Sequence, residues 1–213
     1  RVFAANAFYD NGPFLGAPTG LGAHNWSPMS YSPLTGLVYF RASRAQMVYR
    51  HDDNFVFRPG LNNTGIYRGP QLEEDRALIA ANPPMGGSAL LAWDPLAGTA
   101  RWQVEGGGGG TLATAANLVF QGRGDGGHTG ELVAFDAATG ERLWSYATPN
   151  AMPSGPISYS VNGEQYIAIM GGRGFSGGDD SQARARNPGR VFAFKLGVDP
   201  SDKFVELVGR CVV

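Results

Sequence analysis

Apolar residues along this chain occur in short runs that are interrupted every few positions by glycine, proline, asparagine or aspartate. Such runs between turn-forming residues are typical of β-strands, so the sequence predicts an all-β fold in which helix is a minor component. Residues 111–122, TLATAANLVFQG, and residues 156–170, PISYSVNGEQYIAIM, illustrate the pattern. In the second stretch, Asn162 and Gly163 between two apolar runs predict a two-residue β-hairpin.

One segment of the chain is repeated without gaps. ALLAWDPLAGTARW, residues 89–102, returns as ELVAFDAATGERLW, residues 131–144. Four residues are identical in the two copies at a constant offset of 42 positions: Ala92, Asp94, Gly98 and Trp102 recur as Ala134, Asp136, Gly140 and Trp144. This offset is close to the length of a four-stranded β-propeller blade, so the repeat predicts successive blades.

A third copy of the strand follows at residues 189–197, GRVFAFKLG. Its Ala193 lies 59 positions after Ala134, which implies an insertion supplied by residues 173–188. Within each copy we expect a strand, a turn shaped by aspartate and glycine, and a second strand whose tryptophan packs against the neighbouring blade. The chain then holds about three to four four-stranded blades of a partial ring.

Composition and charge narrow the possible partners. The formal net charge is −1 and no basic block occurs, which argues against nucleic acid and against an anionic membrane surface. No apolar stretch approaches the roughly 18 residues of a membrane span, and the first residues lack the features of a signal peptide. The chain begins at Arg1 inside an apparent strand, so we expect an N-terminal portion to be missing; the lone Cys211 has no disulfide partner within the chain.

The segment from Ala134 to Trp144 fits the pattern Ala-x-Asp-x-x-Thr-Gly-x-x-x-Trp. This pattern is similar to the tryptophan docking motif of quinoprotein alcohol dehydrogenases that depend on pyrroloquinoline quinone (PQQ). Residues 24–40, 110–126 and 163–174 also resemble segments of that family's C-terminal half, in the same order. The resemblance implies that residues 1–213 form a single partial domain, the C-terminal part of an eight-bladed propeller, with a tail at 198–213.

The resemblance also implies an activity. Members of that family oxidise alcohols with PQQ and pass the electrons to cytochrome c or another external acceptor, in the periplasm. They use a Ca²⁺ or lanthanide ion as a Lewis acid and an aspartate as a base. Those ligands and that base belong to the N-terminal half, so in this chain we expect no metal ligand, leave the catalytic residues unknown, and expect the fragment alone to be inactive.

The resemblance places cofactor contacts at two positions of this chain. Asn25 and Trp26 match the family's cofactor-contacting pair, since an amide can donate to a quinone or carboxylate oxygen and an indole offers a flat apolar ring. Gly174 and Ser176 match a second contact zone, where Arg173 replaces the usual tryptophan. The five-glycine run, residues 106–110, stands where relatives place an aromatic residue, which would remove a wall of the substrate pocket.

Other chemical interpretations of the sequence are weaker. The glycine run resembles a phosphate loop but lacks the following Lys-Ser or Lys-Thr, and GRGDGG at residues 122–127 links two strands instead of opening a helix. The three histidines share no metal-ligand spacing, and the paired acids, such as Glu73 and Glu74, are expected in solvated loops. No CxxCH haem motif occurs. The remaining alternative is a non-catalytic propeller that binds proteins, which would have no use for the Asn25 and Trp26 pair.

Overall fold

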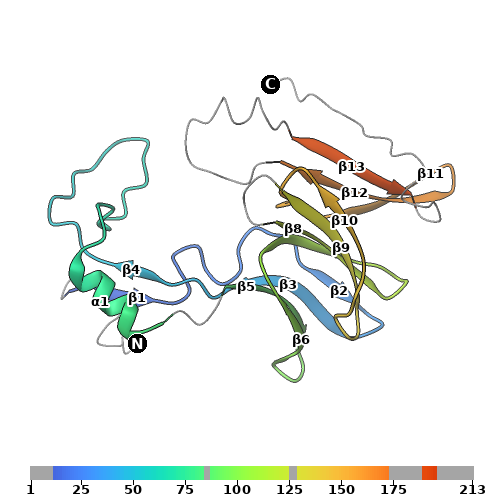
Figure 1. Ribbon diagram of the computed structural model, residues 1–213, viewed down its shortest axis with the longest axis horizontal. Helices are drawn as coiled ribbons and strands as arrows, with labels where there is room; N and C mark the ends of the chain where they lie inside the picture. The colour runs from blue at the N-terminus through green and yellow to red at the C-terminus, as the bar shows by residue number, and fades with distance from the viewer. Residues whose placement is uncertain (1–11, 84–86, 125–128, 173–188, 196–213) are drawn as a thin grey trace. The chain divides into compact units, whose positions relative to one another are not determined.

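The computed structural model describes residues 12–83, 87–124, 129–172 and 189–195. The chain divides into two compact units. One comprises Arg1–Ala23 with Ser43–Gly87, and the other comprises His24–Ala42 with Ser88–Val213. The second unit contains three antiparallel sheets and carries the sequence repeat (Figure 1).

The first sheet of this unit has four strands in the order β2-β3-β5-β6. Their bounds are Ser30–Ser32 for β2, Leu37–Ser43 for β3, Ser88–Asp94 for β5 and Thr99–Glu105 for β6. The β2–β3 and β5–β6 turns each contain a glycine with positive φ, Gly36 at 70° and Gly98 at 67°. The first copy of the repeat, residues 89–102, forms the β5–β6 hairpin, in which β6 is an edge strand of this sheet.

The second sheet is built from consecutive strands, in the order β10-β9-β8-β7. The bounds are Gly108–Ala113 for β7, Leu118–Gly124 for β8, Gly130–Asp136 for β9 and Arg142–Thr148 for β10. The second copy of the repeat is the β9–β10 hairpin, in which β10 is likewise an edge strand. In both copies a β-bulge lies one residue before the tryptophan, so Trp102 faces Ala92 and Trp144 faces Ala134 across the two strands.

The third sheet, in the order β11-β12-β13, has three strands among the described residues. They are Ile157–Val161, Glu164–Gly171 and Arg190–Lys195. Asn162 and Gly163 join β11 to β12 with φ values of 52° and 80°, and two positive φ values in a row are the signature of a type I′ turn. The hairpin predicted from these two residues is confirmed, and so is the prediction of an all-β fold in propeller-like sheets.

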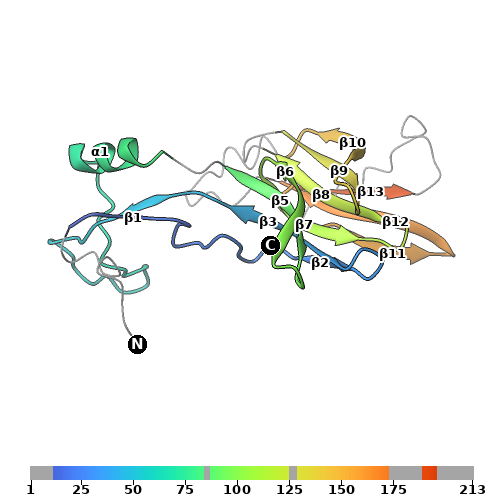
Figure 2. The same cartoon turned by 90° about the horizontal axis from the view of Figure 1, so that it is seen from below.

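The three sheets stack through two apolar cores, with β7–β10 in the middle (Figures 1 and 2). The core between the first two sheets is made by Leu37, Tyr39, Leu90, Ala92, Val119, Val133, Phe135 and Ala137. The core between the second and third sheets is made by Phe120, Leu132, Ala134, Met152, Ile167, Ile169 and Phe192. Side chains alternate between these two cores along β8 and β9, as expected for strands buried on both faces.

Both repeat tryptophans lie between sheets. Trp102 Nε1 donates to the carbonyl of Ala137, 3.1 Å away in the second sheet, and its ring covers Gly140. Trp144 meets Phe194 of the third sheet edge to face, with ring centroids 5.4 Å apart. Each tryptophan therefore packs between its own sheet and the next one, as the repeat predicts, and the role of the pair as a docking motif stays a prediction.

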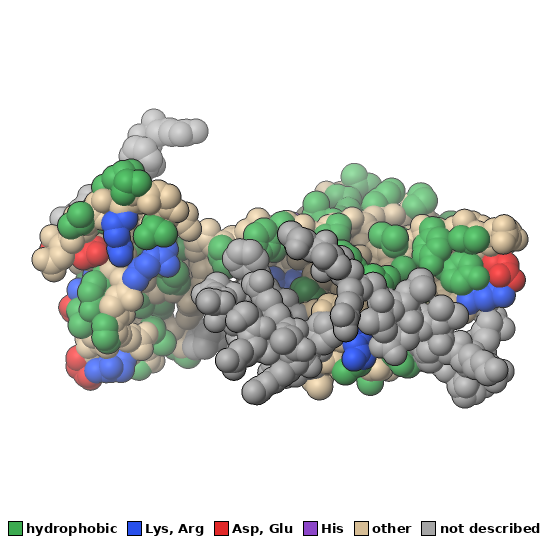
Figure 3. All heavy atoms as spheres, turned by 90° about the horizontal axis from the view of Figure 1, so that it is seen from above, with side chains coloured by type: hydrophobic (Ala, Val, Ile, Leu, Met, Phe, Trp, Pro, Cys, Tyr) green, Lys and Arg blue, Asp and Glu red, His purple; other side chains and the backbone are tan. Residues whose placement is uncertain are grey.

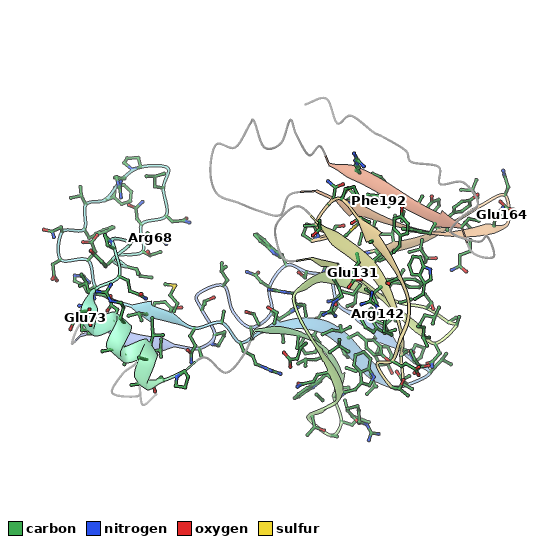
Figure 4. The ribbon with its side chains drawn as sticks, in the orientation of Figure 1. Arg68, Glu73, Glu131, Arg142, Glu164 and Phe192 are labelled. Carbon is green, nitrogen blue, oxygen red and sulfur yellow. The ribbon has the colours of Figure 1, made fainter. Side chains whose placement is uncertain are left out.

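The other unit pairs β1 (Phe14–Gly16) with β4 (Met47–Tyr49) and contains helix α1 (Glu73–Ala81). Residue Glu73, labelled in Figure 4, begins this helix, so the expectation that Glu73 and Glu74 lie in a loop is wrong. Buried Asp75 accepts hydrogen bonds from Arg50 and from the backbone of Leu72, which lower the pKa of its carboxyl group. A contact from outside the helix thus stabilises its first turn.

Candidate functional site

The first strands of the first two sheets, β2 and β7, lie beside each other at the edge where each sheet begins. Thr111 of β7 joins them: its backbone N–H donates to the carbonyl of Pro28 at 2.9 Å, and its hydroxyl lies 2.8 Å from that of Ser30. The same hydroxyl donates to the carbonyl of Tyr39 in β3 at 2.9 Å. Thr111 is buried, so these bonds fix the segment that leads into β2 against the second sheet.

The predicted pair Asn25 and Trp26 lies in this leading segment, residues 24–29. Both residues are exposed, and 73% of the Trp26 surface is open to solvent. Just before them, His24 Nδ1 lies 2.9 Å from the carbonyl of Arg41, and the His24 ring meets Phe40 edge to face. Because a carbonyl can only accept, His24 carries a proton on Nδ1 and donates to β3.

Just after the pair, Pro28 packs against two glycines. A Cβ atom at Gly110 of β7 would overlap with Cγ and Cδ of Pro28, and a Cβ atom at Gly155, ahead of β11, would overlap with Cγ. The segment is therefore held at both ends, by His24 on one side and by Pro28 on the other. The loop therefore presents a largely exposed indole between two fixed points.

The glycine run at residues 106–110 has a packing explanation in this region. A Cβ atom at Gly108 would meet the buried side chain of Gln121, and one at Gly109 would lie 2.5 Å from the carbonyl oxygens of Pro153 and Ser154. With Gly110 against Pro28, three successive positions thus leave no room for a side chain. The backbone of β7 is therefore in direct contact with the segments that precede β2 and β11.

Two arginines occupy the ends of the second strands in the first two sheets. Arg41 of β3 donates to the Ser88 hydroxyl at 2.8 Å. Arg123 of β8 donates to the carbonyl of Glu105, and its guanidinium lies 5.7 Å from the centre of the Phe135 ring. Burial lowers the pKa of Arg123 below its ordinary value, while Glu131 acts in the opposite direction. Glu131 is itself 2.5 Å from Arg142, a pair labelled in Figure 4.

The second predicted contact zone lies outside the described residues, as do Gly174, Ser176 and Arg173 themselves. The structure describes the strand that leads to it. Ser154 Oγ donates to the carbonyl of Met170 at 2.6 Å and accepts from its N–H at 3.2 Å. This ties the end of β12 to the segment before β11.

The sequence singles out Asn25 and Trp26, whose contact with a cofactor stays a prediction, but it does not single out Pro28, Thr111 or Gly155. Pro28 and Thr111 sit within the segments quoted for the resemblance, yet no local pattern indicates that they touch. Within the described ranges, no three His, Cys, Asp or Glu side chains come together as a metal site, and no helix is long and apolar enough to cross a membrane.

Residues 9–167 match a known protein family, described as the glucose/ethanol/alcohol dehydrogenase β-propeller domain, PQQ. Quinohemoprotein alcohol dehydrogenase ADH-IIG of Pseudomonas putida is 36% identical over 203 residues, which is 90% of this chain and 28% of that protein. The quinohemoprotein alcohol dehydrogenase of Comamonas testosteroni is 40% identical over 83% of this chain and 25% of its own length. The 1-butanol dehydrogenase (cytochrome c) of Thauera butanivorans is 39% identical over 81% of this chain and 25% of that protein.

Solved structures give the same relationship. The Pseudomonas putida ADHIIG structure superposes with a TM-score of 0.71 at 35% identity and covers 96% of this chain but 31% of its own. The Comamonas testosteroni enzyme gives 0.68 at 32% identity, over 92% of this chain and 29% of that one. A europium-containing methanol dehydrogenase shares the fold, with a TM-score of 0.55 at 23% identity over 72% of this chain and 26% of its own. The chain therefore spans between a quarter and a third of these relatives.

Proposed function

Because this chain belongs to the family of PQQ-dependent glucose, ethanol and alcohol dehydrogenase propellers, we propose that it is part of a larger quinoprotein that oxidises an alcohol and passes the electrons to an external acceptor. The observation that carries the proposal is the way in which segment 24–29 is held. This segment presents Asn25 and a largely exposed Trp26 on a loop that is anchored at both ends.

The residues of this loop fit PQQ, a planar ortho-quinone with three carboxylates. When bound, PQQ accepts the hydride equivalent from the alcohol. Trp26 would cover an apolar face or edge of the planar rings, and the amide of Asn25 would donate to a quinone or carboxylate oxygen. Arg41 of β3 and Arg123 of β8 add positive charge to this unit, which suits a polyanion. Gly174 and Ser176 would contribute backbone groups.

The remaining machinery belongs to the rest of the complete protein. We propose that a Ca²⁺ or lanthanide ion, the general base and the remaining blades lie outside this chain. The external acceptor would be a cytochrome c or a comparable carrier, as the name of the Thauera enzyme indicates for that relative. We propose a periplasmic location, which the family membership supports. We also propose that residues 1–213 belong to a single partial propeller domain, with 198–213 as a tail.

The contact between Trp102 and the second sheet supports a role of the repeat as the family's tryptophan docking motif. In this proposal Trp102 links its sheet to the next one through an indole N–H bond to a backbone carbonyl and through a glycine that leaves room for the ring. Trp144 makes its link through the edge-to-face contact with Phe194. The motif then serves the scaffold, and the Asn25 and Trp26 loop serves the cofactor.

The test is the variant Asn25→Ala in the complete protein, reconstituted with PQQ. Leaving a buried charged acceptor without its partner costs about 1 to 3 kcal/mol, so the PQQ dissociation constant should rise by a factor between about 5 and 150. Asn54→Ala, at an exposed asparagine in the other unit, is the matched control and should bind PQQ as the wild type does. Unchanged affinity in Asn25→Ala would assign Asn25 to structure, and a wild type that binds no PQQ would favour the protein-binding scaffold.

A further inference from the structure

Pro28 is the point where the beginnings of all three sheets meet. It belongs to the segment before β2, its carbonyl accepts from Thr111 of β7, and its ring lies against Gly110 of β7 and Gly155 ahead of β11. Proline also fixes its own φ and restricts Ser27 before it to extended conformations. The two residues ahead of Ser27 are Trp26 and Asn25, so the position of Pro28 determines where the pair lies.

The space that receives Pro28 exists because two side chains are missing. At Gly155 an added Cβ would overlap with Pro28 Cγ and would touch no atom outside Pro28 closely: its next contacts are Pro28 Cδ at 3.4 Å and Pro28 Cβ at 3.7 Å. No positive φ is required at Gly155 or at Gly110. Backbone conformation therefore does not explain these glycines, whereas contact with Pro28 does.

The same region is linked to the end of β12. Ser154, next to Gly155, exchanges two hydrogen bonds with Met170 at the end of β12. A shift of the segment before β11 would therefore displace Pro28, which contacts Gly155, and the end of β12, which is bonded to Ser154.

We propose that Gly110 and Gly155 form a socket for Pro28, and that this socket is a positioning element that sets the Asn25 and Trp26 loop for cofactor binding. The inference rests on the proposed function, because PQQ binding is its readout. Neither glycine touches the cofactor in this proposal. Each acts through Pro28, and a methyl group at either position moves the loop by displacing the proline ring.

The experiment is a double-mutant cycle between Gly155→Ala and Pro28→Ala in the complete protein. Gly155→Ala should raise the PQQ dissociation constant at least about tenfold, in line with the 1.4 kcal/mol that corresponds to a factor of ten. In the Pro28→Ala background, which removes Cγ and Cδ, the same glycine substitution should change the dissociation constant less than about twofold. Gly107→Ala is the matched control, because its Cβ would meet only the Gly124 carbonyl at 3.8 Å, an ordinary contact.

Gly110→Ala tests the other wall of the socket with Pro28 present, because its Cβ would also lie 3.0 Å from the Pro28 nitrogen, which Pro28→Ala keeps. Thermal unfolding of each apo-protein is measured beside PQQ binding. A loss of affinity that is equal in the two Pro28 backgrounds overturns the socket, as does a Gly155→Ala protein that binds PQQ like the wild type. If Asn25→Ala weakens binding while both glycine variants bind normally, the inference fails and the proposed function stands. If the wild type binds no PQQ, both fail together.

Discussion

Asp136 organises the turn between β9 and β10 with a single carboxylate. Its Oδ1 accepts from the backbone N–H groups of Ala138 and Thr139, both at 2.9 Å, and from the Thr139 hydroxyl at 3.1 Å. Asn117, from the neighbouring turn, reaches its Oδ2 at 3.3 Å. The Thr139 backbone bond is the largest of the effects that lower the pKa of Asp136 in the folded state.

This lowered pKa predicts a pH dependence of stability. A carboxyl group with a lower pKa in the folded state stabilises the protein above its unfolded pKa, close to 4, and the contribution is lost as the pH falls through the folded value. Unfolding free energies of wild type and Asp136→Asn should therefore differ at pH 6 and converge towards pH 3. Asp53→Asn, at an exposed aspartate in the other unit, serves as control. A gap between wild type and Asp136→Asn that widens with acid would contradict this origin of the stabilisation.

At the scale of an element, the turns of the two repeat copies differ in whether a side chain from another sheet packs on them. Gly98 and Gly140 occupy the same turn position with φ values of 67° and 76°. A Cβ atom at Gly98 would meet nothing within 4 Å, whereas one at Gly140 would lie 2.7 Å from the Trp102 ring. In the same turn as Gly140, the carbonyl oxygen of Ala137 accepts hydrogen bonds from the Trp102 indole and from the Tyr39 hydroxyl, the latter at 2.8 Å.

These two glycines form a matched pair for measuring the contact between sheets. Gly98→Ala should cost about 1 kcal/mol, the usual penalty for a side chain in the left-handed region. Gly140→Ala should cost the same amount plus about 1 to 3 kcal/mol for forcing the indole out of its position. Chemical denaturation of the two variants measures the difference directly. Equal destabilisation would mean that Trp102 contributes little to holding the sheets together.

At the scale of the whole molecule, the stack of three sheets has an apolar face at each end. Ile167 and Ile169 of β12 face the second sheet, so alternation places Ile157 and Met170 on the other face, where they are 59% and 62% exposed. On the first sheet Tyr31 is 57% exposed. Apolar side chains are prominent on the three-sheet unit in Figure 3. Such faces normally pack against further sheets.

Residues 1–213 produced alone should therefore associate or aggregate, because open apolar faces and strand edges pair with other chains. They should also show no alcohol oxidation with PQQ, Ca²⁺ and an artificial electron acceptor, since the proposed metal ligands and base lie elsewhere. Light scattering coupled to size-exclusion chromatography measures the mass, and a dye-reduction assay over a panel of alcohols measures turnover. A monodisperse monomer with turnover would contradict both expectations.

Local patterns in the sequence were sufficient for much of the fold. Asn162 and Gly163 predicted their hairpin because φ > 0 at two successive positions is a property of those residues themselves. The repeat predicted two equivalent strand–turn–strand units, since an alternating strand, an aspartate turn and a glycine are specified within about a dozen residues. Helix α1 was missed. Its first turn depends on Arg50, which approaches from another segment.

The sequence by itself determined the strands, the turns and the family to which they belong, because these depend on short-range periodicity and on the conformational preferences of single residues. Tertiary structure alone decided how the Asn25 and Trp26 loop is held. Pro28, Gly110 and Gly155 are far apart along the chain, and the overlap that a Cβ atom would cause exists only after three sheets have stacked. No pattern within one segment encodes that contact. The positions that cannot hold a side chain are set by close packing between distant segments.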